Sequence, residues 1–177
     1  MAGLALDLLL ECRQIFQDAN DIGALGKTLS ALADTENKRG NSDAAIRMER
    51  DALRYIYLAG DVIGIAVSYH NLGNYLRLHA RQPAPALACH LASALIHALT
   101  GAADGGYSTG NAAADLRELG PSAISPADVA ALCDQVGDIP GTDLRRLLTA
   151  LAPDPAAAEQ ALRELICQAQ AAAATPS

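Results

Sequence analysis

The residues that could perform chemistry in this chain are few, and their spacing suits no metal-binding or catalytic pattern. The histidines are His70, His79, His90 and His97. A zinc-binding helix carries its ligands one turn apart, often as H-E-x-x-H, and no two of these histidines have that spacing. Cys89 and His90 could be a nucleophile and its base, but neighbouring residues of a helix point about 100° apart. The sequence therefore predicts structural or surface histidines and no metal site.

Two other patterns could indicate an enzyme. Glycines at positions 101, 105, 106 and 110 could form a phosphate-binding loop, but no G-K-[ST] follows them and no strand precedes them. Asp34 with Glu36, and Glu49 with Asp51, could pair as general acid and base, but we interpret them as ordinary solvated charges. The sequence therefore predicts a protein that is not an enzyme and that uses no cofactor.

An internal repeat organises the first hundred residues. Asn20-Asp21-Ile22-Gly23 recurs as Gly60-Asp61-Val62-Ile63-Gly64, and Leu32-Ala33 recurs as Leu72-Gly73. Both pairs are 40 positions apart (61 − 21, 72 − 32). A period of about 20 to 50 residues is typical of stacked supersecondary units. We therefore expect a helical stack that holds a partner.

Each repeat reads as a helical hairpin. In the first unit, Leu25, Leu29 and Leu32 have the spacing of one helix face, and a second apolar stripe runs from Ala45 to Ile56. The turn at 39–42 separates the two helices, with Ser42 as the expected N-cap. The second unit follows the same plan up to residue 101. Residues 1–20 match the second helix of a hairpin whose first helix is missing.

The motif Tyr69-x2-Leu72-Gly73-x2-Leu76 resembles the tetratricopeptide repeat (TPR) family, in its longer-period form of about 40 residues. The resemblance implies an all-α fold, a right-handed superhelical stack of antiparallel helical hairpins. It covers residues 1–120, as a partial repeat at 1–20, repeats at 21–60 and 61–101, and a degenerate unit at 102–120.

The resemblance also implies where a partner would bind, since the first helix of each hairpin lines the concave groove in that family. Asparagine side chains there could hold a peptide main chain, and lysine or arginine could meet a carboxylate. The alternative is that this is only the solvated face of the stack. The implied partner-binding residues are Lys27, Ser30, Asp34, Asn37, Lys38, His70, Asn71, Asn74 and Arg77.

The C-terminal third does not continue the 40-residue repeat. We expect a three-helix segment at 121–172, which is either a cap on the end of the stack or a separate module hinged at 120–125. Ser125 with Pro126, Thr142, and Asp154 with Pro155 are the expected helix starts. Residues 173–177 are expected to form a disordered tail.

Composition sets further bounds. The net charge of −7 and the pI of about 4.9 argue against a nucleic-acid ligand. The four cysteines show no C-x-x-C pair, so we expect reduced thiols packed as small apolar residues of a cytoplasmic protein. Residues 82–103 carry no charged side chain, yet their prolines, histidines and alanines favour a buried helix over a membrane span.

The function that these observations favour is a non-catalytic module that binds a protein or peptide in its groove. One alternative is a homodimeric scaffold, because the stripe of Leu4, Leu8, Ile15 and Phe16 in the unpaired N-terminal helix must meet something. Another is a ligand-responsive regulatory domain, possibly part of a larger regulator, whose C-terminal helices move at the glycine-rich joints.

Overall fold

The computed structural model confirms the all-α fold class. It describes residues 2–78, 80–103, 106–120, 123 and 125–175. His79, which we expected to be a structural or surface histidine, lies outside these ranges. All the regular structure in these ranges is helical. The helices are α1 (Ala2–Asp18), α2 (Ile22–Lys38), α3 (Ser42–Ala59), α4 (Val62–Leu78), α5 (Pro83–Thr100), α6 (Tyr107–Leu119), α7 (Val129–Val136), α8 (Leu144–Leu151) and α9 (Pro155–Ala174).

The repeated sequence marks the helix starts. The Asp21 carboxylate accepts a hydrogen bond from the Ala24 backbone N–H at 3.0 Å, and Asp61 accepts one from Gly64 at 2.9 Å. Each bond satisfies one of the free N–H groups in the first turn, so α2 and α4 begin in the same way. The predicted cap at Ser42 was wrong by one residue, because Asn41 is the N-cap of α3.

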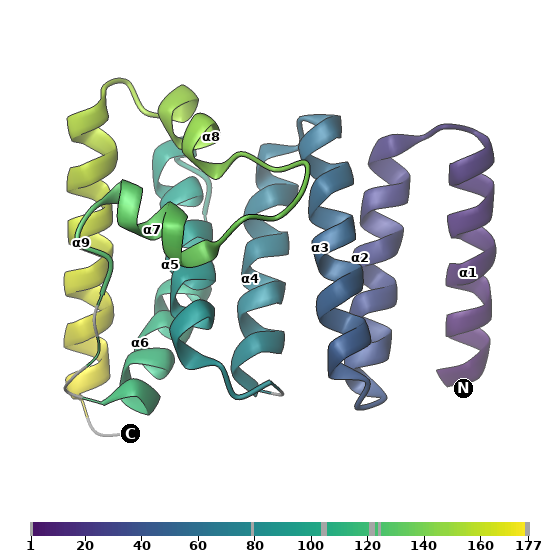
Figure 1. Ribbon diagram of the computed structural model, residues 1–177, viewed down its shortest axis with the longest axis horizontal. Coiled ribbons are helices and arrows are strands. Elements are labelled where there is room, and N and C mark those ends of the chain that lie inside the picture. The colour runs from purple at the N-terminus through teal and green to yellow at the C-terminus, as the bar shows by residue number, and fades with distance from the viewer. Residues whose placement is uncertain (1, 79, 104–105, 121–122, 124, 176–177) are drawn as a thin grey trace.

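Helices α1 to α4 stand side by side in chain order, each packed against the next (Figure 1). Gly26 allows α2 and α3 to approach closely, because a Cβ atom there would lie 2.8 Å from Ile56 Cγ1 of α3. The buried leucines of the predicted stripes, such as Leu32 and Leu53, meet in one hydrophobic core. Burial of these faces is what stabilises helices of this length.

Helix α5 is the centre of the molecule. It contacts α4, α6, α7, α8 and α9. By length and composition alone it could span a membrane, but 67% of that stretch is buried inside the protein. Its polar residues Ser93 and His97 are buried as well. This is the packing of a core helix, as the sequence predicted.

The C-terminal helices cover α5 and α6. Helix α9 packs against α5 and α6, while α7 and α8 lie on α5 (Figure 1). The connection between α7 and α8 reaches α3, since a Cβ atom at Gly141 would lie 2.5 Å from Arg54 Cγ. The segment at 121–172 therefore contacts the repeats along their side and is not confined to the end of the row.

Four predicted details of this region differ in the structure. Asp128 caps α7 in place of Ser125, and Asp143 caps α8 in place of Thr142. In both cases an aspartate carboxylate closer to the first apolar residue accepts the free N–H of the first turn. Helix α9 extends to Ala174, past the start of the predicted tail, and Cys167 on it is exposed instead of packed in the core.

Candidate functional site

The residues predicted to bind a partner lie on α2 and α4. Lys27 and Lys38 are exposed, and the other seven are half-buried. Five of the half-buried side chains make hydrogen bonds to other helices, which join α2, α4 and α6 in a way that none of the sequence motifs had indicated; they are Ser30, His70, Asn71, Asn74 and Arg77. Asp34 bonds to Lys38 of its own helix, and Asn37 Oδ1 has no hydrogen-bond partner among the described residues. We call this face the α2–α4–α6 surface.

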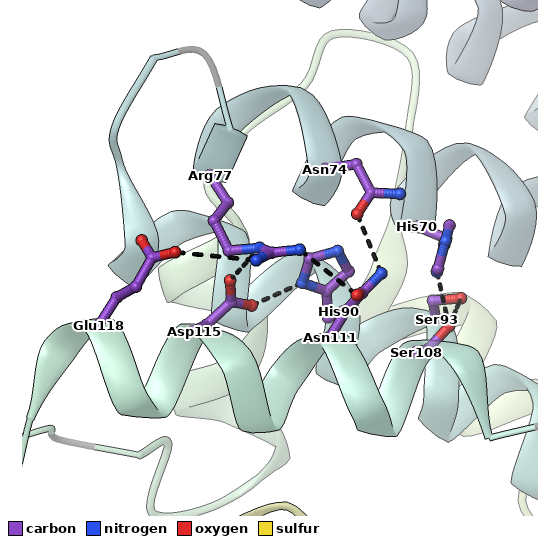
Figure 2. A network of polar contacts seen from close by, with 9 residues as sticks. All are labelled: His70, Asn74, Arg77, His90, Ser93, Ser108, Asn111, Asp115 and Glu118. Atoms are coloured by element: carbon purple, nitrogen blue, oxygen red, sulfur yellow. Dashed lines mark hydrogen bonds and ion pairs between the residues drawn. The ribbon is translucent and has the colours of Figure 1, made fainter. Parts of the chain in front are cut away.

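The seam between α4 and α6 is polar (Figure 2). The Asn111 amide donates to Asn74 Oδ1 at 2.9 Å, and Arg77 Nη2 donates to Asn111 Oδ1 at 3.4 Å. His70 Nδ1 and Ser108 Oγ are 3.0 Å apart. Three of the predicted residues are therefore tied to α6, whose side chains were not among the predicted site residues.

The seam between α2 and α4 closes over a buried carboxylate, Glu49 of α3. Ser30 Oγ lies 3.0 Å from each Glu49 oxygen, and Ser68 Oγ donates to Oε1 at 2.6 Å. The Asn71 amide donates to Ser30 Oγ at 3.3 Å. Glu49 is 0% exposed, so its interpretation as a solvated charge was wrong.

Burial also changes the acidity of Glu49. Desolvation raises the pKa of this carboxyl from 4.5 to about 7, because burial penalises the charged form. The hydrogen bonds from Ser68, Ser30 and Asn71 act in the opposite direction, and the negative charge of Asp34 adds to the increase. Glu49 is thus a buried acid that titrates near neutral pH.

A second buried carboxylate, Asp115 of α6, joins three helices. His90 Nδ1 of α5 lies 2.6 Å from Asp115 Oδ2, and Arg77 Nε of α4 lies 3.1 Å from Oδ1 (Figure 2). Burial raises the pKa of Asp115, while the bond from His90 and the charge of Arg77 oppose that increase. The Arg77 side chain is only 14% exposed, so the guanidinium predicted to meet a partner carboxylate is already paired inside the protein.

The His90–Asp115 pair has the composition of a catalytic dyad but not the access. His90 Nε2 is buried and finds no hydrogen-bond partner among the described residues. It faces Gly73, where a Cβ atom would lie 2.6 Å away. A reacting atom would need to lie about 3 Å from that nitrogen, and the α4 backbone fills the space. The geometry suits a buried polar interaction that joins α5 to α6.

No protein-family model, curated protein or solved structure matches this sequence. Within the described ranges, no group of three histidine, cysteine, aspartate or glutamate side chains is placed to hold a metal ion.

The exposed charges of the α2–α4–α6 surface are paired locally. Lys27 lies 3.2 Å from Asp61, and Lys38 lies 2.6 Å from Asp34. Ion pairs between exposed side chains contribute about 0 to 1 kcal/mol, so both ammonium groups can exchange these partners for others. The surface is close to neutral where these pairs lie, although the whole chain is acidic.

Sequence reasoning missed an apolar strip beside these charges. Val67 and Tyr107 are 47% and 73% exposed, and Ile63 lies one turn from Val67 on α4. Val67 and Tyr107 follow Lys27 at intervals of 40 residues (67 − 27, 107 − 67), so the three stand at the same repeat position on α4, α6 and α2. The signal was available in the sequence: the repeat continues into α6 with the same spacing.

The spacing that would have revealed α6 is carried by its polar residues. Ser68 and Ser108 are 40 positions apart, as are Asn71 and Asn111 (108 − 68, 111 − 71). Ser68 and Asn71 make the contacts on the α2–α4 side described above, whereas Ser108 and Asn111 make those of the α4–α6 seam. A third repeat helix was expected at 102–120 only in degenerate form, and the residues that repeat in it include these polar ones.

Proposed function

We propose that this chain is a non-catalytic binding module that holds an extended peptide or a partner protein on its α2–α4–α6 surface. The observation that carries the proposal is the continuity of this surface. Side chains of three helices are joined across both seams, at Ser30 to Asn71 and at Asn74 to Asn111, and the two asparagines that donate, Asn71 and Asn111, are 40 positions apart (111 − 71). Residues far apart in the chain thus form one face.

The chemistry of the face suits main-chain recognition. The Asn74 carbonyl accepts a bond from Asn111, which leaves the Asn74 amide group with no partner among the described residues. An asparagine offers both a donor and an acceptor to a peptide group. The strip of Ile63, Val67 and Tyr107 beside it would take an apolar side chain of the same ligand, since exposed apolar patches commonly mark interaction sites.

The arrangement of the helices also supports a binding module. We propose that α2 with α3, and α4 with α5, are successive hairpins of a TPR-like stack. Helix α6 would be the first helix of a third hairpin, with α9 packed against it. In such a stack the first helices share one face, and α2 and α4 contact each other, as do α4 and α6. A cytoplasmic scaffold or adaptor is the role that this architecture suits.

A peptide-display selection against the immobilised full chain tests the proposal. We expect enriched peptides to bind the wild-type chain and the control variant Arg47→Ala equally, because Arg47 is an exposed residue of α3, outside the surface. We expect Val67→Asp and Asn74→Ala to weaken binding about tenfold or more, which corresponds to about 1.4 kcal/mol. Circular dichroism checks that each variant is folded.

Two results would contradict this proposal. One is the selection of peptides that bind Val67→Asp and Asn74→Ala at full strength. The other is a selection that enriches no peptide above the background on the wild-type chain.

Self-assembly is a second candidate, favoured by the exposed side of α1. Leu8 and Ile15 are 52% and 60% exposed and lie two turns apart on the same helix face. Light scattering of the wild-type chain should give the mass of a dimer, and Ile15→Asp should give that of a monomer. A wild-type chain that remains monomeric at all concentrations tested would exclude this candidate.

A further inference from the structure

The α2–α4–α6 surface is connected to a buried acid. Glu49 of α3 lies directly beneath the seam between α2 and α4, with Ser30 and Asn71 between it and the solvent-exposed face. Both side chains are half-buried and belong to the proposed docking surface. Glu49 therefore controls how two surface donors are oriented.

The state of this carboxyl decides what its neighbours can do. An ionised carboxylate only accepts hydrogen bonds, so the single hydrogen of the Ser30 hydroxyl points inward, toward the Glu49 oxygens at 3.0 Å. The Ser30 oxygen then accepts the Asn71 amide at 3.3 Å. In this state the Ser30 hydroxyl hydrogen and one Asn71 amide hydrogen donate to groups of the protein, so a ligand cannot use them.

We propose that protonation of Glu49 switches the α2–α4 seam: the new carboxyl O–H donates to Ser30 Oγ, the Ser30 hydroxyl hydrogen turns outward into the position at which Oγ accepted Asn71, and the Asn71 amide hydrogen that it displaces becomes available to a ligand. The proton comes from solvent and one hydrogen bond reverses its direction. Ser68 keeps its shorter bond to Oε1, which holds the carboxyl in place. This switch is a form of regulation of the proposed docking surface, and its role in binding rests on that proposed function.

The surroundings of Glu49 allow it to titrate at physiological pH. From α2 it faces Ser30 and the carboxylate of Asp34; from α4 it faces Ser68, Asn71 and the phenol of Tyr75. None of these groups is a cation, whereas Asp115 is paired with Arg77. Burial without a positive partner raises the pKa of Glu49 to about 7, so both states are populated near neutral pH.

NMR of the full-length, isotope-labelled chain tests the switch without any ligand. The side-chain mobility of Asn71, measured by the heteronuclear NOE of its amide nitrogen, should increase between pH 8.5 and pH 5.5. The Asn111 amide serves as an internal control because its bond to Asn74 involves no carboxylate. Glu49→Gln resembles the protonated acid, so Asn71 should be mobile in that variant at both pH values. Glu11→Gln, at an exposed position of α1, should behave as wild type.

A binding measurement tests the regulatory role separately. Peptides enriched on the wild-type chain should bind about fivefold or more tightly at pH 5.5 than at pH 8.5, and Glu49→Gln should remove this difference. Binding that is independent of pH would overturn the regulatory role even if Asn71 becomes mobile.

The two failures are distinguishable. If the selection enriches no peptide, the proposed function fails, and the NMR measurement still decides whether the switch exists. An Asn71 side chain that is equally rigid at both pH values in the wild-type chain, or that still responds to pH in Glu49→Gln, would overturn the switch itself.

Discussion

Replacing Glu49 by glutamine should change how the stability of this protein depends on pH. Glutamine keeps the size of the side chain and an acceptor for Ser68, but it removes the ionisation. Glu49 is fully buried, with a pKa of about 7 in the folded chain and 4.5 as its ordinary value. Below 4.5 the acid is protonated in both states, so ionisation imposes no penalty there. Between 4.5 and 7 the unfolded chain has lost this proton while the folded chain keeps it, so stability falls as the pH rises and levels off once the folded acid ionises above 7.

The size of this loss follows from the two pKa values. A pKa unit corresponds to about 1.4 kcal/mol, and part of the shift already acts at pH 5. The free energy of unfolding of the wild-type chain should therefore fall, from this group alone, by about 2.5 kcal/mol between pH 5 and pH 8. Glu49→Gln should not show this fall. The difference between the two proteins removes the contributions of other groups, such as the carboxyl of Asp115, whose pKa burial also raises.

Urea unfolding at pH 5 and pH 8, followed by circular dichroism, measures this difference. The matched control is Glu11→Gln, which makes the same substitution at an exposed position of α1. If Glu49→Gln and the wild-type chain lose the same stability between the two pH values, within about 0.5 kcal/mol, the assignment of Glu49 as a buried acid with a raised pKa is incorrect.

Two further predictions concern the packing of α4, α5 and α6. Gly73→Ala should destabilise the protein by about 1 to 3 kcal/mol, because the new Cβ would collide with the buried His90 ring, whereas Gly110→Ala, whose Cβ meets open space on α6, should stabilise it by about 0.5 to 1 kcal/mol. Equal effects at both glycines in thermal unfolding would contradict the close contact. Asp115→Ala should cost about 3 to 5 kcal/mol because it leaves buried polar partners unpaired, and Asp134→Ala, which removes an exposed ion pair, should cost less than about 1 kcal/mol. If Asp115→Ala lowers the stability by no more than Asp134→Ala in the same assay, the buried contacts of Asp115 contribute little to stability.

Much of the helical layout could be read from local signals. The predicted repeat boundaries at 21–60 and 61–101 coincide with the starts of α2 and α4, where Asp21 and Asp61 accept first-turn N–H groups, and with the ends of α3 and α5 at Gly60 and Gly101. These signals work because capping depends on a few neighbouring residues. Helix starts were missed where a later aspartate competed with the predicted cap, as at Asp128 and Asp143.

The candidate site was harder to predict, because its chemistry depends on residues brought together from different helices. The nine predicted residues do lie on α2 and α4, and their role in binding stays a prediction. The sequence did not indicate that Glu49 would be buried, since a glutamate between charged residues on a helix is usually exposed. It also did not indicate that Arg77 would be paired with Asp115, which lies 38 positions away in the chain (115 − 77).

The sequence alone determined that this chain is helical and that a unit of 40 residues repeats in it, because each of these properties arises from contacts between near neighbours or from a periodic apolar face. Only the tertiary structure decided which charges are buried, which polar side chains meet across helices, and which apolar residues stay exposed. The pKa of Glu49, the inaccessibility of His90 and the strip at Val67 and Tyr107 all follow from distances between helices, and burial at such contacts is a property of the assembled fold.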